Sequence, residues 1–235
     1  MICDISQAVQ HIASKAQPLL LIDTCSLIDI VRVPLRGNIN HSHIQGAIDI
    51  ARMGKSGQIS LAVTNTIYNE FKTHLAPTCI ELERYIQELE SKNSSIISAI
   101  ESVGLSYRFS INGLAKQKLP EKLSELAEDL FSLSFMLKRD TGCGDRAHNR
   151  VELVQAPASR GKSESKDCLI IEHYLDLTKK LRATGFDKKI VFVTSNSKDY
   201  GTPGVLRAPL DLEFKAARIE YCNNFAWALS VAECI

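Results

Sequence analysis

The chain has 235 residues, a net charge of +1 and 45% hydrophobic residues, values that are ordinary for a globular protein of one or two domains. No apolar run approaches the roughly 20 residues needed to cross a bilayer. The apolar run LLLI, at 19–22, is too short and too late in the chain for a signal peptide. We therefore expect a cytoplasmic protein, and the near-neutral charge gives no global sign of nucleic-acid binding.

The seven cysteines are scattered along the chain, odd in number and never spaced as CxxC. This pattern excludes a zinc ribbon and a disulfide framework, and it favours reduced thiols. Cys25, Cys168 and Cys222 lie within apolar stretches, where cysteine usually behaves as a small hydrophobic residue. We expect them in the core.

The N-terminal part alternates between helical and strand patterns. A helix is predicted over 5–16, and the continuous apolar run LLLI then predicts a buried strand that stops at Asp23. Thr24 and Ser26 can cap the next helix, which Pro34 ends. The following prediction is a loop over 36–43, a helix over 44–54, a strand over 59–63 and a helix over 66–92 that Pro77 breaks or kinks.

Helical patterns continue over 96–104 and 121–140, but the residues from Thr141 to Ser165 show no helical period. This irregular segment, about 141–165, is rich in basic residues, and long irregular stretches are often functional. The remaining elements are a helix over 165–183, a strand over 189–194, a polar loop, a short strand over 218–222 and a helix over 223–233. No internal repeat is present.

Strands that alternate with helices predict a three-layer α/β sandwich around a central, mostly parallel sheet. We expect one domain spanning 1–235 with a helical insertion at about 78–140. In such sheets ligands bind beyond the carboxyl ends of the strands. The strand ends therefore identify the candidate site residues.

Four acidic residues follow the predicted strands or begin the helices beside them: Asp23, Glu70, Asp167 and Asp199. Each has a simpler role of its own, since Asp23 and Asp167 could cap helices, Glu70 could be a solvated helix residue and Asp199 a turn former. Their order along the chain nevertheless predicts that all four meet at one edge of the sheet. Carboxylates that meet there repel each other unless a hard cation such as Mg²⁺ lies between them. Such a hydrated cation can activate water for phosphodiester hydrolysis.

Four segments resemble the motifs of PIN-domain nucleases, in family order over residues 19–200. They are LLLIDTCSLI, VTNTIYNEF, KSESKDCLIIEHYL and IVFVTSNSKDY. The resemblance implies that Asp23, Asp167 and Asp199 hold Mg²⁺ or Mn²⁺, and that Glu70 completes the set or orients water. In the commoner last motif an acid stands where this chain has Asn196. The chain is in this respect similar to larger bacterial PIN-like proteins with Thr-x-Asn and a later Asp, and Asn196 would be a neutral ligand or a water-orienting group.

The resemblance further implies an endoribonuclease that acts on single-stranded or structured RNA. Supporting or substrate-facing groups would be Thr24, Ser26 and Ser195, and phosphate contacts would be Arg150, Lys162 and Lys166. Toxins and phage-defence effectors both use this fold, so an antitoxin or another regulatory partner, and self-association, stay open.

Two other functions stay open beside the nuclease. The neutral Asn196 keeps a catalytically inactive PIN-like RNA-binding or scaffold protein under consideration. A phosphatase or nucleotide-binding domain has less support, because ASRGKS at 158–163 lacks the preceding glycine of a phosphate-binding loop. A phosphatase of the haloacid type would also need an acid at the position of Cys25.

Overall fold

Continuous apolar runs form the centre of the sheet. The computed structural model describes residues 1–36, 41–106, 113–159, 164–202 and 204–233. All side chains of β2 (Leu19–Ile22) and β5 (Ile190–Val193) are buried, because helices cover both faces of these strands. The two strands pair in parallel, with Leu20 opposite Val191. The predictions of buried strands at these two places are confirmed.

The central sheet has six strands in the order β1-β4-β3-β2-β5-β8, and every neighbouring pair is parallel. The strands at 59–63 and 218–222 are confirmed as β3 (Ser60–Thr64) and β8 (Ile219–Cys222). Two short strands, β1 (Ile2–Cys3) and β4 (Phe135–Leu137), extend one edge. The sequence had suggested a continuous helix across β4, and that prediction is wrong.

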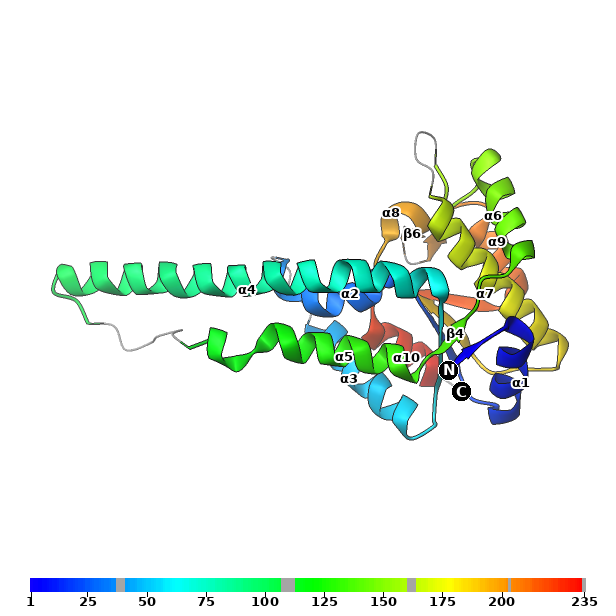
Figure 1. Ribbon diagram of the computed structural model, residues 1–235, viewed down its shortest axis with the longest axis horizontal. Coiled ribbons are helices and arrows are strands. Elements are labelled where there is room, and N and C mark those ends of the chain that lie inside the picture. The colour runs from blue at the N-terminus through cyan, green and yellow to red at the C-terminus, as the bar shows by residue number, and fades with distance from the viewer. Residues whose placement is uncertain (37–40, 107–112, 160–163, 203, 234–235) are drawn as a thin grey trace.

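Helices cover both faces of the sheet, which gives the predicted three-layer sandwich (Figure 1). One layer contains α1 (Ile5–Lys15), α7 (Ser165–Ala183) and α9 (Leu210–Ala217). The other contains α2 (Thr24–Arg32), α3 (His41–Lys55) and α10 (Phe225–Glu233), together with α4 (Asn65–Ser102) and α5 (Leu119–Leu133). No helix in the described ranges is long and apolar enough to span a membrane.

Helices α4 and α5 lie side by side and project beyond the sheet as a long arm (Figure 1). The 38 residues of α4 correspond to about 57 Å of helix. Its N-cap is Thr64, whose hydroxyl accepts from the Ile67 amide. Pro77 lies inside this helix without ending it, so the expected break does not occur, and the pattern over 96–104 belongs largely to the same helix.

Two segments predicted to be irregular are helical over part of their described residues. Helix α3 begins at His41, and His43 is buried against the Phe225 ring at 4.7 Å, so neither histidine is a loop residue. The segment expected to be irregular over 141–165 begins with α6 (Thr141–Glu152), which packs on α7. Five short elements complete the structure: η1 (Val33–Leu35), η2 (Ala115–Gln117), α8 (Ser197–Tyr200), β6 (Gly201–Thr202) and β7 (Val205–Leu206).

Candidate active site

Asp23 follows the buried strand β2 and is itself only 2% exposed. It occupies the N-cap position of α2, where the Thr24 and Cys25 amides lower its pKa, although it forms no regular capping hydrogen bond. Its Oδ2 instead accepts a hydrogen bond of 2.6 Å from the Thr194 hydroxyl, at the end of the neighbouring strand β5. The parallel pairing of β2 and β5 therefore places and orients this carboxylate, and the backbone amides of Thr24 and Cys25 at the start of α2 also interact with it.

Glu70 lies in the second turn of α4, and two groups hold its carboxylate. The Thr24 hydroxyl donates to Oε2 at 2.8 Å, and the Lys166 ammonium lies 3.4 Å from Oε1. These contacts join the starts of α2, α4 and α7. Glu70 is therefore a fixed part of this sheet edge rather than a solvated helix residue.

Asp167 and Asp199 meet a third carboxylate, that of Glu164. One carboxylate oxygen from each lies within 4.8 Å of the other two. Asp167 is in the first turn of α7, and Glu164 immediately precedes that helix. Asp199 is in α8, where the Asn196 side-chain amide donates to its Oδ2 at 2.8 Å. Asn196 is also the N-cap of α8, so it positions Asp199 directly.

Burial, together with the neighbouring carboxylates, raises the pKa values of two of these acids. Burial, and to a lesser degree the nearby Glu70 carboxylate, raise the pKa of Asp23 to about 6, although the Thr194 hydrogen bond opposes the rise. Burial raises the pKa of Asp167 to about 8, and the carboxylates of Asp23, Glu70, Glu164 and Asp199 contribute to the increase. The site therefore holds more negative charge than its own groups can neutralise.

A divalent hard cation fits this set of donors. All the converging ligands are carboxylate oxygens, which Mg²⁺ and Mn²⁺ prefer. Cys25 is a soft donor beside Asp23, and burial together with the adjacent acids raises the pKa of its thiol, which keeps it protonated. A bound cation would stabilise the charged carboxylates at neutral pH and relieve their mutual repulsion.

The other predicted residues have different positions. Thr24 contacts Glu70, as a supporting group would. Ser26 is completely buried and therefore faces no substrate, and a supporting role for it stays a prediction. Ser195 is half-buried between β5 and α8. Lys166 lies beside Glu70, and Lys162 lies outside the described residues.

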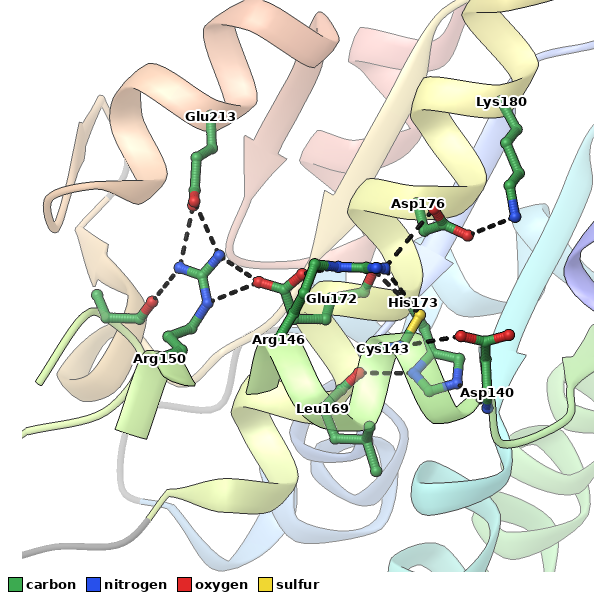
Figure 2. Close-up of polar contacts among 11 residues, drawn as sticks. Asp140, Cys143, Arg146, Arg150, Leu169, Glu172, His173, Asp176, Lys180 and Glu213 are labelled. Atoms are coloured by element: carbon green, nitrogen blue, oxygen red, sulfur yellow. Dashed lines mark hydrogen bonds and ion pairs between the residues drawn. The ribbon is translucent and has the colours of Figure 1, made fainter. Parts of the chain in front are cut away.

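Arg150 is not a phosphate contact, because its side chain is only 3% exposed. Figure 2 shows its guanidinium between two carboxylates, and it donates to Glu172 at 2.6 Å and to Glu213 at 2.8 Å. It also donates to the carbonyl of Ala156. This arginine joins α6, α7 and α9, so its function is structural.

Sequence reasoning missed two groups at this site, Glu164 and Thr194. Glu164 stands three residues before Asp167, and this spacing brings two side chains to the same side at the start of a helix. Thr194 is the threonine that ends the last motif, and its hydroxyl holds Asp23. The first signal was available in the sequence, while the second required the pairing of β2 with β5.

The raised pKa values predict that the metal-free protein loses stability as pH rises. Between about pH 4 and pH 8 the folded state keeps protons on Asp23 and Asp167 that the unfolded state has released, so the free energy of unfolding falls. Denaturant titrations at pH 5 and pH 8 in EDTA measure this change. The same titrations in saturating Mg²⁺ should show a smaller decrease, and a metal-free protein that is equally stable at both pH values would contradict the shifts.

Comparison with known families agrees with this geometry. A PIN-domain family model matches residues 20–200, which covers most of the chain and all four predicted acids. Comparison with characterised proteins and with solved structures gives no match. PIN domains form a superfamily of nucleases, and the matched range starts in β2 and ends in α8, the elements that carry Asp23 and Asp199. The chain belongs to the PIN-domain family.

Proposed function

We propose that this protein is a Mg²⁺- or Mn²⁺-dependent endoribonuclease that hydrolyses phosphodiester bonds in RNA. The observation that supports this proposal best is the meeting of acids from four separate segments at the carboxyl edge of a parallel sheet. A scaffold without catalysis has no need for a cluster that raises the pKa of its own members. Acids whose pKa values are raised by burial and by neighbouring carboxylates are typical of catalytic sites.

In the proposed site Asp23, Glu164, Asp167 and Asp199 would hold the cation. When bound, it would lower the pKa of a coordinated water and stabilise negative charge on the scissile phosphate. Thr194 fixes Asp23, and Thr24 fixes Glu70, which lies within electrostatic reach of Asp23 and Asp167 and would orient the attacking water. Lys166 balances the charge of Glu70 and would contact a phosphate beside it.

A titration with metal tests the proposal before any substrate is chosen. Mg²⁺ or Mn²⁺ should raise the melting temperature of the wild-type protein by mass action on the folded state. Asp23→Asn should lose most of this increase. Cleavage of a generic RNA, with DNA of the same sequence as the comparison, then tests the reaction and the substrate. A wild-type protein that is not stabilised by the metals and does not cleave RNA would favour the alternative function, a catalytically inactive RNA-binding or scaffold protein.

The last motif gives a prediction about two neighbouring residues. Asp199→Asn should reduce RNA cleavage far more than Asn196→Ala, because it removes an anionic ligand, whereas Asn196→Ala removes a hydrogen bond that positions it. The second loss should be about 10- to 100-fold, as for other groups that orient metal ligands. Initial rates at fixed Mn²⁺ compare the two variants. An active Asp199→Asn beside an inactive Asn196→Ala would reverse the roles assigned to them.

A toxin or phage-defence effector is the cellular role that we propose for such an enzyme, with an antitoxin as its regulatory partner. Expression of the wild-type chain alone should then arrest growth of a bacterial host, whereas Asp167→Asn should not. Equal growth with both chains would argue for a housekeeping ribonuclease.

A further inference from the structure

A groove of about 570 Å³ begins at the carboxylate site and runs between α4 and α6. The first turns of α4 form one wall, α6 forms the other, and the first residues of α7 lie between them. Glu70 and Lys166 belong both to this groove and to the candidate active site. The groove is therefore continuous with the site, and its volume lies within the usual range for ligand pockets.

The charged groups of the groove are mainly basic. Arg139 and Lys166 line it, together with the imidazoles of His74 and His148, and Glu70 is its one acidic side chain among the described residues. Lys166 is paired with Glu70, and His148 lies 3.2 Å from Glu152, but Arg139 is exposed and forms no ion pair with any residue in the described ranges. Its charge is available to a ligand, and the chemistry that suits it is an anion such as a phosphate.

The groove also has an apolar wall, to which Val151 of α6 and Leu169 of α7 contribute. A double helix presents phosphates and sugars outward and keeps its bases stacked inside, so it cannot use such a wall. A single strand can place phosphates on the cations and base faces on the apolar and imidazole side chains. We propose that this groove binds the single-stranded RNA that flanks the scissile phosphodiester, an inference that rests on the proposed function.

Gly144 allows a direct test, because it lines the groove from α6 and a Cβ added there meets no atom within 4 Å. Gly144→Lys and Gly144→Glu therefore add opposite charges to the same place without a clash, and replacing a helical glycine does not weaken the helix. Gly144→Ala is the neutral control. A second pair is Arg139→Gln and Lys138→Gln, since Lys138 is adjacent and exposed but does not line the groove.

Fluorescence anisotropy with a short labelled single-stranded RNA, in EDTA to prevent cleavage, should give a graded series. Relative to Gly144→Ala, Kd should fall about fivefold for Gly144→Lys and rise about fivefold for Gly144→Glu, the size of one exposed ion pair. The slope of log Kd against log salt should decrease by about 0.7 in Arg139→Gln and stay unchanged in Lys138→Gln. Melting temperatures of all variants confirm folding.

Equal Kd values across the Gly144 series, no binding by the wild-type protein, or equal competition by duplex RNA would overturn the proposal. Tighter binding of single-stranded DNA would overturn its assignment to RNA. If the wild-type protein cleaves RNA in Mn²⁺ while the series shows no gradient, only the groove is wrong. If binding follows the gradient without any cleavage, the proposed function alone is wrong.

Discussion

Asp167→Asn is expected to make the metal-free protein more stable and, on the proposed function, to abolish the metal-dependent cleavage of RNA. Burial and four neighbouring carboxylates raise the pKa of Asp167 to about 8, so the charged form of this group destabilises the folded state. The uncharged amide that replaces it avoids this cost. We expect a gain on the order of 2 kcal/mol in the free energy of unfolding at pH 8. RNA cleavage should decrease by more than about 100-fold, because loss of a metal ligand exceeds the loss from groups that only orient ligands.

The matched control is Asp176→Asn in the same helix. Asp176 pairs with Lys180 at 2.8 Å and also lies beside Arg146, away from the carboxylate site. Its substitution should leave cleavage and metal-induced stabilisation unchanged. Chemical denaturation in EDTA and in Mg²⁺, with cleavage rates for both variants, gives the comparison. An Asp167→Asn protein that is destabilised without metal would show that this carboxylate is held by favourable contacts rather than by repulsion.

Arg150→Met is expected to lower the free energy of unfolding by about 3–5 kcal/mol, the cost of removing one partner from a buried ion pair. The buried guanidinium donates to Glu172, Glu213 and the Ala156 carbonyl, and these partners belong to three parts of the fold (Figure 2). Methionine fills a similar volume but cannot satisfy any of them. The loss should appear as a lower denaturant midpoint, with helix α6 exchanging its amide protons earlier than α7.

Arg146→Met is the matched control, because Arg146 contacts the same Glu172 from the same helix but has a side chain that is 46% exposed. This variant should lose less than about 1 kcal/mol in the free energy of unfolding, as expected for an exposed ion pair. The double variant Arg150→Met with Glu172→Met should recover part of the stability, since it removes the buried Glu172 carboxylate together with its partner. Glu213 also loses Arg150, but its side chain is 30% exposed and can be solvated. A similar loss in both single variants would mean that burial does not determine the strength of this network.

The central sheet could be predicted because its inner strands are uniform in sequence. β2 and β5 are short continuous runs of Leu, Ile, Val and Phe, which only a strand covered on both faces explains. The short strand β4 could not be predicted, since its three residues follow a helix with no intervening turn signal. β4 is a strand because it pairs with β1 and β3, and the residues of these two strands lie far from it in the sequence.

Helix α6 was hidden by its composition. Its buried positions, Cys143, Ala147 and Arg150, have helical spacing, but one is a charged residue and the helix contains two glycines. A hydrophobic period is absent because an ion-pair network replaces apolar contacts on this face. For the same reason the basic residues of this segment suggest a phosphate-binding strip. Arg150, however, is buried inside the protein.

Asp23, Asp167 and Asp199 could be named from sequence because strand ends and helix starts in parallel α/β folds have a fixed relation to one sheet edge. The hydrogen bonds that orient each carboxylate could not be predicted from the sequence. The bonds from Thr194 to Asp23 and from Thr24 to Glu70 join residues 171 and 46 positions apart. Such pairs follow from the strand order, which local patterns do not encode.

The strand order also sets the time at which this site can exist during synthesis. Asp23 is synthesised before Thr194 and Asp199, which follow β5, and β5 pairs directly with β2 in the middle of the sheet. At about 5–20 residues per second, their synthesis follows that of Asp23 by roughly 10–35 s. A nascent chain therefore cannot assemble the carboxylate cluster until β5 and α8 have been translated, and under the proposed function it would not cleave RNA before that point.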